Sequence, residues 1–388
     1  MTEVEITPDE ARRYLLHHHG LATPPPSGRA HVRPVFEALG AVQLDPLAPM
    51  GDNASLVFHA RVRGLKNGDV YGALLPGAAF EHFGKERCLL PARAFPHYRD
   101  QAKKTPAWRL TKQLERVPVE ALEAVYAEVA ERGPVTAADL RDRGRVRPID
   151  WSGWKSTSRM STMALEVLTL RCRLVVSGRT PGGKIYDLPS RALPDHHALP
   201  SEPFARWALL ERVRQAGLLS RAGSPMWSMI REARTSSLPD DLVSQGVLEA
   251  VRIRGSRRPY LAMAGFRERI GRGHRGDRVR VLAPLDPLIW DRKLVRHVFG
   301  FEYVWEVYKP ARQRRWGWYV CPLLFRGQLV GRLEARTRDG ALWVDGLWME
   351  PGLAVPERAL AAVLRRHARA CGVEEHRWTA GARRQLSS

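Results

Sequence analysis

The sequence predicts an α+β protein built from tandem winged-helix units, with a smaller β-rich subdomain at its C-terminal end. Three observations predict this fold class. The order helix, helix, hairpin recurs along the chain and is clearest between residues 133 and 188. Residues 309–344 alternate as strands do and are separated by short glycine turns. At 388 residues the chain is also long enough for two or three compact domains.

These patterns divide the chain into four expected parts. Residues 1–100 form an N-terminal winged helix, residues 101–195 a second winged helix, and residues 196–275 a third winged-helix-like unit. Residues 276–388 form a β-rich subdomain with a closing helix. The third copy repeats the order of elements and not the residues themselves, as is common in diverged repeats.

The first unit is expected to open with two helices. Thr7-Pro8-Asp9-Glu10 is a capping box with proline at the first helical position, so a helix begins there and ends at Gly20. A second helix is expected from Val32 to Leu39. A third helix follows the capping residues at 51–53, and residues 81–91 have the composition of strands.

The second unit has the most complete winged-helix pattern. Residues 97–132 have helical periodicity, and Thr136 with Asp139 three residues later predicts a helix over 136–141. A further helix is expected through 163–170. Residues 173–188 then form a basic hairpin, the predicted wing.

The last two parts follow the same logic. Helices are expected over 202–216 and 239–245, followed by a second basic hairpin over 248–262. A final helix is expected over 356–370, after the strands of the C-terminal part.

Charge is the strongest compositional signal. The chain carries 62 Lys and Arg against 41 Asp and Glu, a formal net charge of +21 at pH 7. A globular protein this basic usually has a polyanionic partner, and nucleic acid is the common one. A GC-rich coding sequence could explain the excess of arginine over lysine, but it does not explain the net charge.

Several other classes of protein are excluded. No apolar run approaches the roughly 18 residues of a membrane span, the N-terminus does not resemble a signal peptide, and we expect no membrane partner. There is no phosphate-binding G-x-x-x-x-G-K-S/T motif, no G-x-S-x-G elbow and no zinc-type cluster. Residues 271–276 are glycine-rich but lack the flanking strand and helix, so they are predicted to be a basic linker. We expect a cytoplasmic, nucleoid-associated protein with four reduced thiols: Cys88, Cys172, Cys321 and Cys371.

One short polar pair is the candidate site of chemistry. Gln43 and Asp45 lie two residues apart in an otherwise apolar run, and side chains at i and i+2 of an extended segment face the same side. Burying the amide without a partner would cost about 2–7 kcal/mol. Two interpretations follow: either the pair lines a wet cleft, or Asp45 caps a local turn before Pro46 while Gln43 fixes a loop.

The sequence resembles the YcaQ/AlkZ-like family of tandem winged-helix DNA glycosylases over most of its length. The similar stretches are Gly40–Pro46; Val135–Leu140 with Trp151 and Trp154; Leu285–Arg292; Phe299–Tyr303; Glu306–Pro310; and Arg315–Val320. These stretches fall in three regions, of which the last contains the four between residues 285 and 320. Three such regions in the same order are strong grounds for the fold and weaker grounds for the activity. The family pattern usually places basic or histidine residues seven to eleven positions after the motif aspartate. Here that span is Asp52-Asn53-Ala54-Ser55-Leu56, which places the chain in a divergent branch.

The resemblance implies a fold and a reaction. The winged-helix units would form a concave basic cradle, and Gln43 and Asp45 would be the catalytic Q-x-D motif. Such enzymes hydrolyse the N-glycosidic bond of bulky N-alkylated purines, such as N7-alkylguanine, and unhook interstrand crosslinks in double-stranded DNA. Asp45 would stabilise the oxocarbenium-like sugar and activate water, and Gln43 would orient that water. No cofactor or metal is required, and we expect a monomer.

Basic residues of the two wings and of one loop are candidates to bind DNA phosphates. They are Arg173, Arg179 and Lys184; Arg252, Arg254, Arg257 and Arg258; and Lys309, Arg312, Arg314 and Arg315. If they do, log affinity falls steeply with log salt. A solvated basic surface is the alternative for each of them.

Two other functions remain open at this stage. A non-catalytic winged-helix DNA-binding or regulatory protein would use the same basic surface, and neither Gln43 nor Asp45 would then affect affinity. A nuclease is less consistent with the sequence, because no carboxylates are spaced to hold metal ions.

Overall fold

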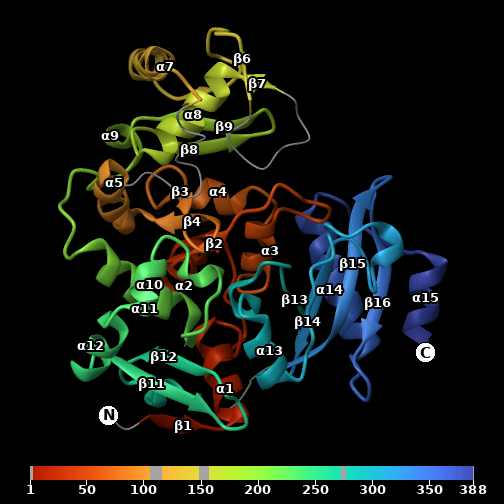
Figure 1. Ribbon diagram of the computed structural model, residues 1–388. Helices are drawn as coiled ribbons and strands as arrows, with labels where there is room; N and C mark the ends of the chain where they lie inside the picture. Colours follow the sequence, from red (N-terminus) through yellow and green to blue (C-terminus); the bar gives the residue numbers. More distant parts are fainter. Residues whose placement is uncertain (1–2, 105–115, 148–156, 272–276, 388) are drawn as a thin grey trace. The chain divides into compact units, whose positions relative to one another are not determined.

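The computed structural model describes residues 3–104, 116–147, 157–271 and 277–387 (Figure 1). Helices and strands are mixed along the chain, which confirms the α+β class. Contacts divide the chain into two compact units. Unit 1 consists of Met1–Val70, Leu210–Met226 and Glu232–Ser388, and unit 2 consists of Tyr71–Leu209 and Trp227–Arg231.

The N-terminal helices of unit 1 begin and end where the local signals predict. Helix α1, Pro8–His18, has both hydrogen bonds of the capping box between Thr7 and Glu10. Helix α2, Val32–Leu39, ends at Gly40, whose φ of 68° is left-handed. Helix α3, Asn53–His59, is capped by the Asp52 side chain, which accepts from Ser55 N–H.

A four-stranded sheet joins the start of unit 1 to its middle. Strand β1, Val4–Ile6, pairs in parallel with β11, Leu248–Ile253. Strand β12, Pro259–Met263, completes the predicted hairpin and pairs with β10, Leu219–Ser220. The other elements of this region are α11 (Arg231–Thr235) and α12 (Leu238–Ser244). The hairpin and α12 were predicted, whereas the pairing with β1 was not.

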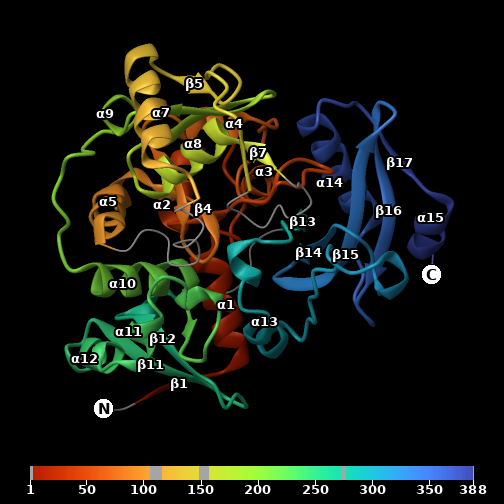
Figure 2. The same ribbon diagram turned by 45° about the horizontal axis from the view of Figure 1, so that its top comes forward.

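The C-terminal part of unit 1 is a five-stranded sheet in the order β13-β14-β15-β16-β17. Its elements are β13 (Arg280–Val281), α13 (Arg292–Phe299), β14 (Val320–Phe325), β15 (Gln328–Arg338), β16 (Ala341–Met349), α14 (Glu357–Ala370), β17 (His376–Trp378) and α15 (Ala380–Ser387). Helices α14 and α15 both pack against β16 (Figure 2). The prediction of strands from residue 309 onward was wrong for the first eleven residues, since 309–319 form a loop.

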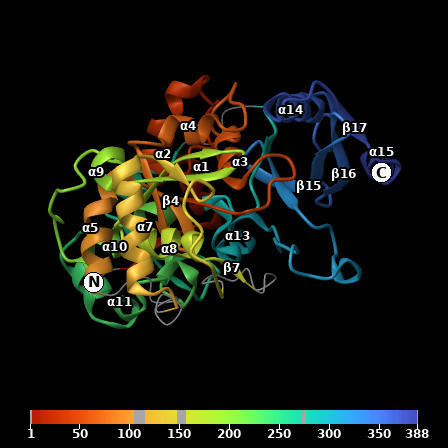
Figure 3. The same ribbon diagram turned by 90° about the horizontal axis from the view of Figure 1, so that it is seen from above.

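Unit 2 contains two antiparallel hairpins and a pair of packed helices. Strands β3 (Ala79–Phe83) and β4 (Arg87–Pro91) form one hairpin, and β8 (Val175–Thr180) and β9 (Gly183–Asp187) form the predicted wing. The helices α7 (Val119–Arg132) and α8 (Met160–Leu170) pack on each other (Figure 3). The remaining elements are α4 (Asp69–Leu74), α5 (Phe95–Lys104), β5 (Val135–Thr136), β6 (Arg145–Val146), β7 (Ser158–Arg159), α9 (Pro189–Ala192) and α10 (Phe204–Ala216), of which α4 and α10 continue into unit 1.

The helix predicted over 136–141 does not form. In a capping box the Thr side chain accepts from the backbone N–H three residues later, but here the Thr136 hydroxyl donates. Its N–H and its hydroxyl both donate to the Asp139 carboxylate, at 2.7 Å each. Asp139 N–H donates instead to the Thr136 carbonyl, which closes a turn. The residue pair was correctly seen, but it stabilises a turn after β5.

Some predictions fall outside the described residues. They include Trp151 and Trp154, residues 105–115 of the expected long helix, and residues 272–276 of the basic linker. The division into four parts stays a prediction. Within unit 1, residues from the expected first, third and fourth parts share one hydrophobic core, which includes Tyr14, Val251, Phe266, Leu294 and Phe301.

Candidate active site

The segment that carries Gln43 and Asp45 is fixed in place from its first residue. Gly40 ends α2 in a left-handed conformation, and its carbonyl accepts from Gln215 Nε2 at 3.2 Å. A Cβ at Gly40 would lie 3.2 Å from Gln215 Cγ. Both the backbone angle and this close approach therefore require glycine before the short strand β2, Val42–Gln43.

Asn53 links this strand to the C-terminal part of unit 1. Its side chain is fully buried, and its Nδ2 donates to the Gln43 carbonyl at 2.8 Å. Its Oδ1 accepts from Leu285 N–H at 3.1 Å. Two of the stretches that resemble the family, around residues 43 and 285, are therefore joined by one side chain. In the sequence Asn53 was noted among the capping residues 51–53 and as part of a departure from the family pattern, and neither observation predicts this link.

Asp45 is half-buried, and one local hydrogen bond to its carboxylate is present. Leu47 N–H donates to Asp45 Oδ1 at 2.9 Å, which is the turn that the alternative interpretation expects. The described part of the chain offers this carboxylate no ion pair within 4.0 Å. Burial raises the pKa of Asp45, and the bond from Leu47 offsets part of that rise. Gln43, by comparison, is only 7% exposed.

A buried tyrosine lies within electrostatic range of Asp45. Tyr319 has no solvent-exposed surface, and its hydroxyl has no hydrogen-bond partner among the described residues. Burial raises the pKa of Tyr319 well above its usual value, and Cys321 and Asp45 add to that rise. Tyr319 was quoted for the family resemblance but was assigned no role; nothing in its local sequence indicates this position.

The backbone around Tyr319 is held by one carboxylate. Glu334 accepts from Trp318 N–H at 2.7 Å and from Tyr319 N–H at 3.1 Å. Any side chain at Gly317 would reach this carboxylate, since a Cβ there would lie 2.2 Å from Glu334 Oε2. Tyr319 therefore has little freedom to move away from its buried position.

The loop that carries four of the candidate DNA contacts is organised by Glu306. This carboxylate is 1% exposed and accepts from the backbone N–H groups of Arg315 and Trp316 and from Lys309 Nζ. Burial would raise the pKa of Glu306, but the bonds from Lys309 and the two N–H groups lower it overall. The charge of Glu306 thus stabilises the backbone of this loop.

A buried ion pair fixes the position of the block around residue 286. Arg61 donates to both oxygens of Asp286, at 2.7 and 2.9 Å, and both side chains are at most 1% exposed. Arg61 also donates to the carbonyls of His19 and Val57 at 2.8 Å. Because every charge is matched, this pair is structural, and removal of one partner would leave the other buried and unpaired.

Most of the eleven candidate DNA contacts are paired with carboxylates. The pairs are Arg173 with Glu123, Arg179 with Glu81, Lys184 with Glu81 and Glu166, Arg252 with Glu3, Arg254 with Glu5, Arg258 with Asp291, Lys309 with Glu306, and Arg315 with Glu302. In the described part of the chain only three have no carboxylate partner: Arg257, Arg312 and Arg314. Exposed pairs such as Arg254 with Glu5 contribute about 0–1 kcal/mol and can exchange for phosphate.

The hairpin β8–β9 of unit 2 differs, because two of its cations contact a buried carboxylate. Arg179 and Lys184 both contact Glu81, whose side chain is completely buried. Glu166 accepts from Lys184 at 2.9 Å and from Arg87 at 2.7 Å. Burial would raise the pKa of Glu166, but the two neighbouring cations hold it far below its usual range. These residues stabilise unit 2 whether or not they also contact DNA.

Neither a metal cluster nor a membrane span is found in the described ranges. No group of three or more His, Cys, Asp or Glu side chains there could hold a metal ion. None of the helices described is long and apolar enough to cross a membrane.

Comparison with known proteins defines the class of enzyme. A family model described as "DNA glycosylase AlkZ-like" matches residues 36–372. The structure of the DNA glycosylase AlkZ of Streptomyces sahachiroi is similar, with a TM-score of 0.61 and 17% sequence identity. That match covers 97% of this chain and 100% of the other.

The protein is therefore an enzyme of the DNA glycosylase class, a hydrolase of N-glycosyl bonds in DNA that acts in DNA repair. The family match includes Gln43, Asp45, Asn53 and Tyr319. The chain belongs to the AlkZ-like DNA glycosylase family. This result confirms the resemblance found in the sequence.

Proposed function

We propose that the protein is a monofunctional glycosylase that releases bulky N-alkylated purines, with Asp45 and Gln43 as its catalytic residues. The observation that carries this proposal is the surroundings of Asp45. It is half-buried, has no ion-pair partner in the described residues, and keeps a raised pKa. A carboxylate whose charge nothing neutralises is suited to stabilise a positive charge that develops beside it.

The chemistry needs no strong acid. An N7-alkylated guanine is cationic, so when the bond between N9 and C1′ breaks, its electron pair goes to N9 and the base leaves neutral. The sugar becomes oxocarbenium-like, and Asp45 stabilises that charge. Water then bonds to C1′ and its proton passes to the Asp45 carboxylate, which leaves an abasic site. Gln43 orients the water, and Asn53 holds the backbone from which both residues project.

The same proposal extends to the DNA-binding surface. Tandem winged-helix units would form a basic cradle for double-stranded DNA, and interstrand crosslinks would be unhooked by the same hydrolysis. Arg257, Arg312 and Arg314 support this role best, since they have no carboxylate to displace. The other eight candidate residues stay part of the proposal, with weaker expected effects where the pair is buried. We further infer that the enzyme works as a monomer in the nucleoid.

Base release from defined lesions tests the proposal. DNA with a single N7-methylguanine, and DNA with a nitrogen-mustard crosslink, are incubated with the wild type, Asp45→Asn and Gln43→Ala. We expect abasic sites with the wild type, a loss of at least 100-fold for Asp45→Asn, and a smaller loss for Gln43→Ala. Equal release by all three proteins, with DNA affinity unchanged, would instead support a DNA-binding role for this segment.

A further inference from the structure

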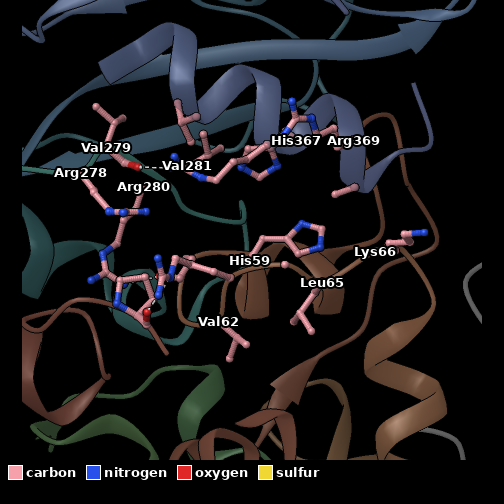
Figure 4. Close-up of a pocket in the computed structure, with 17 residues that line it drawn as sticks. His59, Val62, Leu65, Lys66, Arg278, Val279, Arg280, Val281, His367 and Arg369 are labelled. Carbon is pink, nitrogen blue, oxygen red and sulfur yellow. Dashed lines mark hydrogen bonds between the residues drawn. The ribbon is translucent and has the colours of Figure 1, made fainter. Parts of the chain in front are cut away.

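Unit 1 contains a cavity that takes no part in the proposed reaction. Its volume is about 360 Å³, within the roughly 300–1,000 Å³ usual for small-molecule sites. Pro25 and three segments far apart in the sequence line it: residues 59–66 from the end of α3, residues 278–281 at β13, and residues 363–370 of α14 (Figure 4). Neither Gln43 nor Asp45 is among the lining residues.

All of the charged side chains that line the cavity are basic. Six arginine or lysine side chains line the cavity, and no aspartate or glutamate does; they are Arg63, Lys66, Arg278, Arg280, Arg366 and Arg369. In the described ranges none of the six side-chain charges forms an ion pair with a carboxylate, unlike most of the candidate DNA contacts; the Asp69 carboxylate near Lys66 accepts from its backbone N–H instead. Like charges gathered without counter-charges repel one another, and a bound anion relieves that repulsion.

Two buried side chains leave hydrogen-bonding nitrogens unused at this cavity. Arg280 is 5% exposed and its Nε has no partner among the described residues. His367 is 4% exposed and its Nδ1 likewise has none. Buried polar groups are normally hydrogen-bonded. Arg280 Nε–H can therefore donate to a bound ligand, and His367 Nδ1 can donate or accept according to its tautomer.

The imidazole of His59 faces that of His367, with ring centroids 5.5 Å apart (Figure 4). Both ring nitrogens of His59 are buried and have no partner in the described residues. Burial lowers the pKa of His59 to about 4, and burial together with His59 and Arg366 holds the pKa of His367 well below its usual value. Both imidazoles are therefore neutral at pH 7, and each presents one N–H donor.

Three of the six cations are held in place by backbone carbonyls. Arg280 donates to the carbonyls of Ala60 and Thr23, and Arg63 donates to the Pro25 carbonyl at 3.0 Å. Arg366 donates to the Val279 carbonyl at 3.3 Å. The remaining lining is largely apolar, with the side chains of Val62, Leu65, Val279, Val281 and Val363. Such preorganisation favours an anion that also has an apolar or flat part.

We propose that this cavity binds the phosphate monoester of a nucleotide-sized ligand. Planar guanidinium groups match phosphate oxygens, and a dianion balances more of the accumulated charge than a monoanion does. A cavity of about 360 Å³ suits one terminal phosphate with its attached residue better than it suits the continuous backbone of a duplex. The phosphate can come from a free nucleotide or from the 5′ end of a DNA strand, which have the same chemistry.

Calorimetric titration with deoxyadenosine 5′-monophosphate, on the full chain at low salt, tests this proposal. We expect saturable 1:1 binding that inorganic phosphate competes with and deoxyadenosine does not. The double variant Arg278→Gln/Arg369→Gln changes two exposed side chains, so it should fold normally and bind at least tenfold more weakly. Arg365→Gln is the matched control, because Arg365 is exposed on the same helix but does not line the cavity.

Two further experiments are needed. One distinguishes a free nucleotide from a DNA strand end as the source of phosphate, and the other distinguishes this proposal from the proposed glycosylase function. If DNA strand ends are the ligand, a short hairpin DNA with a 5′-phosphate should bind more tightly than the same hairpin with a 5′-hydroxyl. If free nucleotides are the ligand, only the nucleotide should bind this cavity, and the 5′-phosphate of the hairpin should make no difference. Asp45→Asn should bind the nucleotide as the wild type does, whatever its glycosylase activity. No binding of nucleotide and no effect of the 5′-phosphate, or equal losses in the double variant and in Arg365→Gln, would overturn the inference.

Discussion

The tetrapeptide Leu-Asp-Pro-Leu occurs twice in this chain, around Asp45 and around Asp286, and the two aspartates have opposite surroundings. Both make the same local turn, in which the carboxylate accepts from the N–H two residues later, at 2.9 and 3.0 Å. Asp286 is fully buried and is also bound by both terminal nitrogens of Arg61. Asp45 is half-buried, and the described residues provide no cation for it.

The comparison shows that a short motif determines the local turn, whereas the fold determines which residues surround the carboxylate. Four identical residues produce the same turn because that hydrogen bond is local. The role of the carboxylate is set by a residue far away in sequence: Arg61 fills this place for Asp286, and no described residue does so for Asp45. In our account the Asp286 carboxylate stabilises the fold, and the Asp45 carboxylate stabilises a transition state.

The largest expected effect on stability comes from breaking the paired aspartate. Asp286→Asn keeps the shape but leaves the Arg61 guanidinium buried without its counter-ion, so unfolding free energy should fall by about 3–5 kcal/mol. Urea denaturation measures this fall, with Asp45→Asn as the matched control in the same tetrapeptide. Equal stability of the two variants would show that the ion pair is not what distinguishes these positions.

A smaller loss of unfolding free energy is expected at Asn53, which joins the segment around Gln43 to the segment around Leu285. Asn53→Ala leaves the Gln43 carbonyl and the Leu285 N–H without their partner, at a cost of about 1–3 kcal/mol. Because the catalytic segment also loosens, kcat for base release should fall while DNA affinity is kept. Asn67→Ala, which removes an exposed amide in the next loop, should change both by little. An Asn53→Ala enzyme with unchanged kcat would contradict the positioning role of this amide.

The surroundings of Asp45 also predict the pH dependence of activity. An ordinary aspartate has a pKa of 3.8, and burial raises the pKa of Asp45 above it. The reaction needs the carboxylate, so single-turnover release should fall as pH drops through a midpoint above 3.8. An acid limb at or below that value, with the protein still folded, would show that this group does not govern the rate.

The smallest expected effect concerns individual phosphate contacts. Arg312→Ala removes an exposed cation that has no carboxylate partner in the described chain. We expect modestly weaker DNA binding and a salt slope shallower by about 0.9, the value for one phosphate contact. Arg254→Ala should change the slope less, since Glu5 already neutralises that guanidinium. A larger change in salt slope for Arg254→Ala than for Arg312→Ala would indicate that exposed ion pairs open readily on DNA.

Local signals in the sequence predicted a large part of the fold. The capping box at Thr7, the helix end at Gly40 and the hairpins of both wings depend on residues close together in the chain, and all were confirmed. The expected helix at 136–141 failed, since the same residue pair can close a turn instead. The strand β1 was missed because its partner β11 lies about 247 residues later.

The candidate site, too, could be predicted only where local sequence patterns indicate its residues. Gln43 and Asp45 were found because they are polar residues at a strand spacing. Asn53, Arg61 and Tyr319 gain their meaning from partners or neighbours distant in sequence, which no local pattern records. The eight carboxylate-paired cations were all counted as available charge, because composition does not show which acids fold back onto them.

Single-turnover release of N7-methylguanine by Asp45→Asn, measured beside the thermal stability of the same protein, tests the central claim most directly. Because the folded pKa of Asp45 is raised, its ionised form costs stability above that pKa, and the neutral amide removes the cost. We predict a rate at least 100-fold lower and a melting temperature equal to or higher than that of the wild type. A wild-type rate, or a lost rate explained by unfolding, would contradict the assignment of Asp45 as the catalytic carboxylate.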